Sequence, residues 1–110
     1  MVGNNRLVSV RDRRALDSGA VVTPDIVPAG ATAVTAKVTV VDTVGSGFLT
    51  VNPGGNLTVG AATINWSTDG QILNNGVNLT LSPLREVTVI AGGTGSSATQ
   101  FVIDITGYFV

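Results

Sequence analysis

The chain has 110 residues, of which 44% are hydrophobic and 12% are charged, and its formal net charge is −1. This length suits a single domain with one hydrophobic core, and the apolar content excludes an intrinsically disordered chain. His and Cys are both absent, which removes the usual general base, the thiolate nucleophile and the soft metal ligands. The near-neutral, slightly acidic charge disfavours nucleic acid as a partner of the whole domain.

The kinds of residue present favour β-structure over helix. Val, Thr and Gly are abundant, whereas Lys37 and Glu86 are the only Lys and Glu in the chain. β-branched side chains fit a pleated sheet and lose rotamer freedom in a helix. The composition therefore indicates a protein built from strands.

Alternation of apolar and polar residues with a period of two recurs between short clusters of Gly, Pro and Asn, and no segment has a helical period. The segment 33–41 is the clearest example, since Val34, Ala36, Val38 and Val40 lie on one face of the expected strand. The expected strands are 6–10, 20–26, 33–41, 48–52, 62–67, 77–82, 86–91 and 100–106. The cluster Asn74-Asn75-Gly76 is interpreted as part of a tight turn.

Seven or eight short strands at spacings near ten residues predict an all-β fold, an antiparallel β-sandwich of jelly-roll-like or Greek-key type. An immunoglobulin domain is less favoured because its Cys–Trp–Cys pattern is absent. We expect residues 1–14 to form a basic N-terminal segment that includes the first strand, and residues 15–110 to form a single sandwich domain. No apolar run approaches the ~18 residues of a membrane span, so none is expected.

Three stretches resemble a repeat module of secreted surface proteins from actinobacteria and other bacteria, which is often appended to hydrolase domains. The stretches are Val-Pro-Ala-Gly-Ala-Thr-Ala-Val at 27–34 followed by Gly-Phe-Leu-Thr-Val at 47–51, then Ile-Asn-Trp at 64–66, and Asp-Ile-Thr-Gly-Tyr-Phe at 104–109. The opening departs from the module, where Arg-Leu is often followed by Asp-Thr-Arg. The resemblance implies a non-catalytic accessory module on the outside of a cell.

The residues themselves also argue against an enzyme. A glycosidase-like pair or a Ca²⁺ site would have to be drawn from Asp42, Asp69 and Asp104, which are scattered singly in the sequence. Acidic side chains at turns and strand ends more often cap backbone groups or are themselves solvated. We therefore expect no catalytic residues, no metal and no cofactor.

The few aromatic side chains are candidates for ligand contacts. Exposed Trp or Tyr rings beside amide groups are typical of carbohydrate-binding sandwiches, and Trp66 with Asn65, together with Tyr108, fits that pattern. The competing interpretation places Trp66 in the core, because it alternates with apolar neighbours. Both interpretations stay open at this point.

Charged residues are distributed unevenly. A basic N-terminal group is formed by Arg6, Arg11, Arg13 and Arg14. It is interpreted either as a solvated terminus or as a set of ion-pair partners for Asp12, Asp17 and acids of a neighbouring subunit. The interpretation ranked last is an arm that contacts an anionic polymer. Asp104 lies within the expected strand 100–106, whose alternation of apolar and polar residues is clear. On an outward face it would be solvated, and if buried it would be a structural acid with an Arg partner.

The sequence as a whole predicts an extracellular or cell-surface module for attachment to carbohydrate or another cell-envelope polymer, or to further copies of itself as a dimer or trimer. The alternative is a structural component of a virion or other assembly, such as a jelly-roll spike or fibre domain forming a symmetric oligomer. Sandwiches have edge strands, and this chain carries few charges to block pairing at them, which favours self-association in either case.

Overall fold

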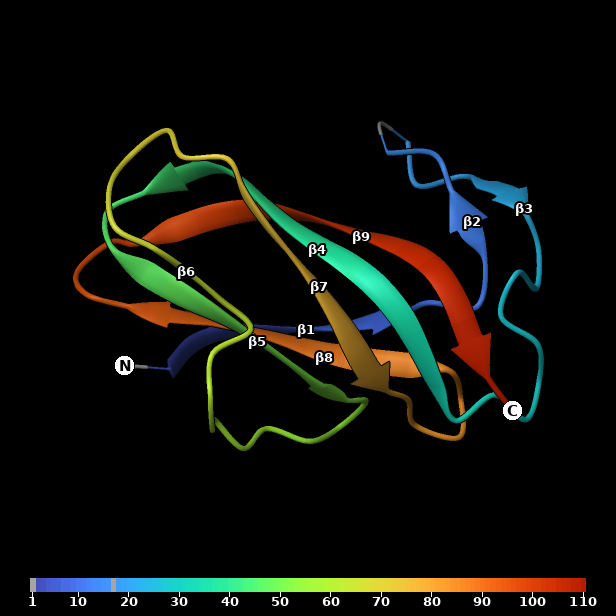
Figure 1. The fold of residues 1–110 in the computed structure, drawn as a ribbon. Coiled ribbons are helices and arrows are strands. Elements are labelled where there is room, and N and C mark those ends of the chain that lie inside the picture. The colour runs from blue at the N-terminus through green and yellow to red at the C-terminus, as the bar shows by residue number, and fades with distance from the viewer. Residues whose placement is uncertain (1, 17) are drawn as a thin grey trace.

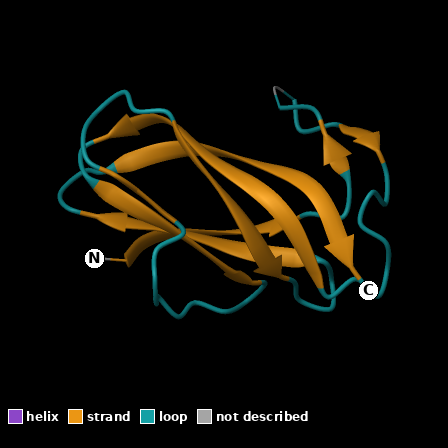
Figure 2. Cartoon of the chain, viewed as in Figure 1, coloured by secondary structure: helices purple, strands orange, loops and turns teal. Residues whose placement is uncertain are grey.

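The computed structural model describes residues 2–16 and 18–110 and shows an all-β protein, with no helix among these residues (Figure 2). Its strands are β1 (Val2–Ser9), β2 (Arg13–Arg14), β3 (Val21–Thr23), β4 (Ala33–Val44), β5 (Gly47–Pro53), β6 (Ile64–Trp66), β7 (Leu73–Thr80), β8 (Glu86–Gly93) and β9 (Ala98–Phe109). No helix in the described part of the chain is long and apolar enough to cross a membrane.

Two antiparallel sheets face each other to form a sandwich. One has the strand order β1-β8-β5-β6 and the other the order β7-β4-β9, while β2 and β3 form a separate pair. That small pair stands away from the sheets at one end of the molecule (Figure 1). Consecutive strands β4 and β5 lie in opposite sheets, and each pairs with a strand from the second half of the chain, as in Greek-key sandwiches.

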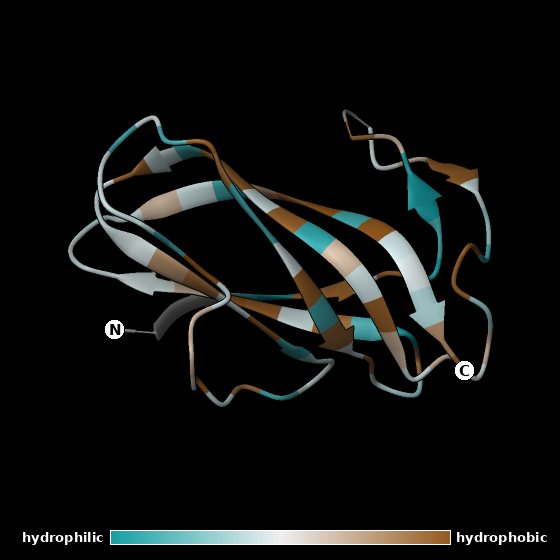
Figure 3. Ribbon diagram, in the orientation of Figure 1, coloured by the Kyte–Doolittle hydropathy of each residue, from teal (hydrophilic) through white to brown (hydrophobic). Residues whose placement is uncertain are grey.

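The apolar side chains of the alternating strands fill the space between the sheets. In β4 the residues Val34, Ala36, Val38 and Val40 are buried, and the intervening residues reach the outer surface. The brown and pale bands along β4 and β9 in Figure 3 show this alternation. Removing these side chains from water is the main favourable contribution to the fold.

The predicted all-β antiparallel sandwich is thus confirmed, with differences in detail. There are nine strands rather than seven or eight, because the two-residue β2 is too short to show any period. The turn predicted at Asn74-Asn75-Gly76 is wrong: these residues lie within β7, opposite the segment 37–39 of β4. Pairing with a long central strand outweighs the local turn preference of Asn-Gly.

The basic N-terminal segment contributes a strand to the sandwich. β1 pairs with β8 along most of its length, with Arg6 opposite Val89 and Val8 opposite Val87. Residues 13 and 14 then turn outward into the pair formed by β2 and β3.

The two long sides of the sandwich differ. On one side β6 and β7 lie close together, and Asn75 Nδ2 donates a hydrogen bond to the carbonyl oxygen of Thr63 at 3.1 Å. On the other side the edge strands β1 and β9 do not approach each other in this way within the described part of the chain. The sandwich is therefore open along the edges of β1 and β9.

Candidate binding cleft

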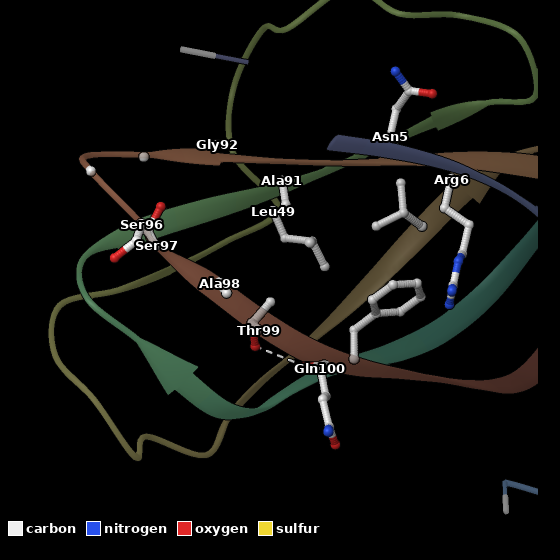
Figure 4. Close-up of a pocket in the computed structure, with 14 residues that line it drawn as sticks. Asn5, Arg6, Leu49, Ala91, Gly92, Ser96, Ser97, Ala98, Thr99 and Gln100 are labelled. Carbon is white, nitrogen blue, oxygen red and sulfur yellow. Dashed lines mark hydrogen bonds between the residues drawn. The ribbon is translucent and has the colours of Figure 1, made fainter. Parts of the chain in front are cut away.

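A cleft of about 870 Å³ lies on this open side, between the β1 and β8 end of one sheet and the start of β9 in the other. Arg6, Leu49, Ala91 and Gln100 are among the residues that line it (Figure 4). A volume of ~300–1,000 Å³ is typical of small-molecule sites. The cleft is thus large enough for a ligand of several ring units.

Strand register explains why these side chains reach the cleft. Arg6 lies opposite Val89, which faces the core, and Phe101 lies opposite Val40, which is fully buried. Side chains on paired positions share a face of the sheet. Arg6 and Phe101 therefore point between the sheets from opposite walls.

The floor of the cleft is apolar and its rim is polar. Leu49, Val89, Ala91 and Phe101 supply the apolar surface. Hydroxyl groups at the rim come from Ser96, Ser97 and Thr99, whereas the side chains of Asn5 and Gln100 point away from the cleft (Figure 4). A mainly apolar wall with a few polar groups that fix orientation is the usual composition of a ligand site.

Among the described residues, Arg6 is the only charged one that lines the cleft. No ion pair to Arg6 occurs within the described part of the chain, and its side chain is exposed to solvent. The cleft therefore carries one unneutralised positive charge and no carboxylate.

The β8–β9 loop closes one end of the cleft and depends on a glycine. Gly93 has φ +148°, and a Cβ there would lie 2.5 Å from the carbonyl oxygen of Ser46. The loop then turns back through a hydrogen bond from the Ser97 N–H to the Thr94 carbonyl oxygen at 3.2 Å. This close approach to the β4–β5 turn sets the position of Ser96 and Ser97 at the rim.

A second, smaller cavity of about 230 Å³ lies further along the same open side. Its wall includes Val8 of β1 and Ile103 of β9, and it shares Phe101 with the larger cleft. The apolar surface between β1 and β9 thus extends beyond the larger cleft towards β2.

The three predicted ligand residues are not brought together. Trp66 is only 3% exposed, and its Nε1 donates a hydrogen bond to the Val44 carbonyl oxygen at 3.2 Å, so the ring belongs to the core. Asn65 is exposed on the outer face of β6. Tyr108 is 51% exposed, but it pairs with Val34 at the other end of β4, roughly 30 Å of strand away from Val44. Trp66 therefore offers no stacking face, and the three side chains form no common site.

The basic residues also separate into different environments. Arg11 makes a bidentate contact with Asp12, with Nε–Oδ1 at 2.9 Å and Nη2–Oδ2 at 2.8 Å. Arg14 approaches the same carboxylate at 3.6 Å, whereas Arg13 is exposed on β2. Asp17, the other predicted partner, lies outside the described residues. The interpretation of this group as partners of Asp12 thus holds for Arg11 and Arg14.

Asp12 is the buried centre of a polar cluster at the surface of the protein. Its side chain is 1% exposed, and its Oδ1 also accepts a hydrogen bond from the Asp25 N–H at 2.9 Å. Arg85 joins the cluster by donating to Asp25 Oδ1 at 2.9 Å and to the Val27 carbonyl oxygen at 3.0 Å. These contacts hold the β2–β3 pair against the sandwich, which an isolated two-stranded unit needs for stability.

We expect the stability of the protein to fall between about pH 4 and pH 2 because of Asp12. The hydrogen bond from Arg11, followed by the one from the Asp25 N–H, lowers the pKa of Asp12 from 3.8 to about 2. The carboxylate therefore stabilises the fold above its unfolded pKa, and this contribution is lost as the pH falls through the folded pKa. Thermal unfolding from pH 6 to pH 2 checks this.

The Asp12→Asn variant is expected to melt lower than the wild type at pH 6, with the difference shrinking towards pH 2. Asp104→Asn is the matched control, since Asp104 is exposed. A constant difference between Asp12→Asn and the wild type over the whole pH range would contradict the role of the charge.

Asp104 lies on the outer face of β9, opposite Lys37 of β4. Both side chains are exposed, which corresponds to the solvated alternative rather than to a buried acid with an Arg partner. The described residues hold no group of three acids that could bind a metal ion, so Asp42, Asp69 and Asp104 do not converge.

Comparison with known proteins adds no assignment, since no family model, curated protein or solved structure matches the chain. The resemblance to a secreted bacterial surface module stays a prediction.

The sequence predicts that Arg6 belongs to a basic segment, and it does not predict that Arg6 lines a cleft. The signal was present, because Arg6, Val8 and Val10 have the same parity and the two valines are apolar. The serine rim had no such signal, since Ser96 and Ser97 reach the cleft through a loop.

Proposed function

We propose that this protein is a non-catalytic attachment module of the cell exterior that binds carbohydrate in the cleft between β1, β8 and β9. The observation that carries the proposal is the combination of an apolar floor containing Phe101 with a rim of hydroxyl groups. Sugar rings present apolar C–H faces and polar hydroxyl edges, so they match such a lining on both sides.

The lining also supports binding rather than catalysis. The chain contains no His or Cys, and no acid of the described residues lines the cleft. General acid–base chemistry on a glycosidic bond requires a pair of carboxyl groups beside the ligand. A ligand held here contacts apolar side chains, hydroxyl groups and one guanidinium.

The test is to fill the cleft with a larger side chain. Ala91 lies on the cleft floor in β8, and Ala91→Phe is expected to weaken binding to purified bacterial cell walls and soluble polysaccharides by at least about tenfold. Co-sedimentation and isothermal titration calorimetry measure this effect.

Asn74→Phe is the matched control, because Asn74 is exposed on the outer face of β7 and the change adds a ring of the same size. This variant should bind as the wild type does. If the wild-type chain binds none of the polysaccharides, or if Ala91→Phe binds them unchanged, the proposed function is wrong.

A second candidate function is assembly with further copies of the chain, as expected of a structural component of a virion or fibre. The observation that favours it is the long, unpaired edge of β9, twelve residues with Asp104 as its only charge. Such edges pair readily between molecules. A stable symmetric oligomer in light scattering at both low and high salt would favour assembly, and a monomer at high concentration would exclude it.

A further inference from the structure

We propose that the ligand of the cleft is an acidic oligosaccharide, with a sugar carboxylate paired with Arg6. This inference rests on the proposed carbohydrate function and narrows it to one class, polymers that contain uronic acid or a similar carboxylated sugar.

The position of Arg6 is the first argument. Its side chain enters the cleft from β1 on the same face as Val8, next to an apolar floor. A charge beside a low-dielectric surface interacts more strongly with a counter-ion than a charge in open water. The planar guanidinium also presents paired N–H donors that match the two oxygens of a carboxylate.

The other cationic groups provide the second argument: three of the five contact acids, and Arg13 and Lys37, which make no ion pair among the described residues, do not line the cleft. Arg11 and Arg14 contact Asp12, and Arg85 contacts Asp25. Within the described part of the chain Arg6 has no such acidic neighbour, and no acid lines the cleft. In a chain with net charge −1, this cleft is a local positive site that an anion can neutralise.

The third argument is the length of the cleft. Figure 4 shows Arg6 and Ser97 at opposite ends, with Leu49 and Ala91 between them. Arg6 is level with Val89, and Gly93 beside the serine rim lies four residues further along β8, a distance of ~13 Å. A single small anion would occupy only the Arg6 end, whereas an oligomer reaches both the guanidinium and the serine hydroxyls.

The experiment compares two ligands of the same shape. The probes are trigalacturonate and its fully methyl-esterified form, which keeps the sugar rings and removes the negative charges. Calorimetry at low and high salt gives the affinities. We expect the acid to bind about tenfold or more tightly than the ester, and the preference to weaken at high salt.

Arg6→Gln is the test variant and Arg13→Gln is the matched control, because both changes remove one exposed Arg but Arg13 does not line the cleft. Arg6→Gln should bind acid and ester equally, and Arg13→Gln should keep the wild-type preference. Thermal unfolding confirms that both variants are folded. In the wild type, the ¹⁵N signal of Arg6 Nε should shift with the acid and not with the ester.

Each of the following outcomes overturns the inference. If acid and ester bind equally to the wild type, or if Arg6→Gln keeps the preference, the charge of Arg6 is not used and a neutral glycan remains the candidate. If monogalacturonate binds as tightly as the trimer, the site takes a small anion. If neither trimer binds and neutral polysaccharides do, the proposed function survives without the acidic ligand; if no polysaccharide binds, both fail.

Discussion

Replacement of Trp66 by alanine is expected to lower the free energy of unfolding by about 3–5 kcal/mol, the usual cost of truncating a large buried aromatic side chain. The ring is almost fully buried between the sheets, and its Nε1 satisfies the Val44 carbonyl oxygen near the end of β4. The substitution removes both the packing and this hydrogen bond. Urea unfolding followed by circular dichroism measures the change.

Two variants separate the role of the Trp66 ring in the core from a role in ligand binding. Trp66→Phe keeps much of the packing and loses the hydrogen bond, so its destabilisation should be clearly smaller. Tyr108→Ala removes an aromatic ring that is half-exposed at the end of β9, and it should change stability by less than about 0.5 kcal/mol. Equal losses for Trp66→Ala and Tyr108→Ala would contradict the assignment of Trp66 to the core.

Gly47→Ala is expected to destabilise the protein by about 1–3 kcal/mol through overpacking. A Cβ at Gly47 would lie 2.5 Å from Trp66 Cζ2 and 2.6 Å from the Gly92 carbonyl oxygen. The indole ring is held in the core and the carbonyl belongs to the neighbouring strand, so neither can move away cheaply. The same unfolding measurement applies.

Gly76→Ala is the control for this effect. Gly76 lies within β7, as Gly47 lies within β5, but a Cβ there meets nothing within 4 Å. Alanine in a strand avoids part of the entropy cost of ordering glycine, so Gly76→Ala should be neutral or slightly stabilising. A Gly47→Ala variant as stable as Gly76→Ala would show that β5 and β8 can separate to admit a methyl group.

Trp66 and Gly47 also affect the shape of the cleft, because the packing around Trp66 adjoins the loop that carries the serine rim. Gly47 pairs with Gly93 on β8, and Gly93 approaches the Ser46 carbonyl oxygen. A shift of β5 away from β8 would move Ser96 and Ser97 relative to Arg6. We therefore regard the small residues at this end of the sandwich as a requirement for the shape of the cleft.

Much of the local structure follows from the sequence alone. The period-two pattern of β4 and β9 predicts both the strands and the faces they bury, because alternation reports on side-chain direction in any sheet. The same pattern favours a core position for Trp66 and puts Arg6 on the face of Val8 and Val10. The β-sandwich class follows from the number and spacing of such segments.

The site required the tertiary structure. Alternation states which face a residue occupies, and it does not state which strands become neighbours, since pairing joins segments that are distant in the chain. Only the strand order leaves the edges of β1 and β9 unpaired and brings Arg6 and Phe101 to one cleft. For the same reason the cluster of Asp12, Asp25 and Arg85 could not be predicted: its members come from three connecting segments that meet at one end of the sandwich, and no local sequence pattern predicts that contact.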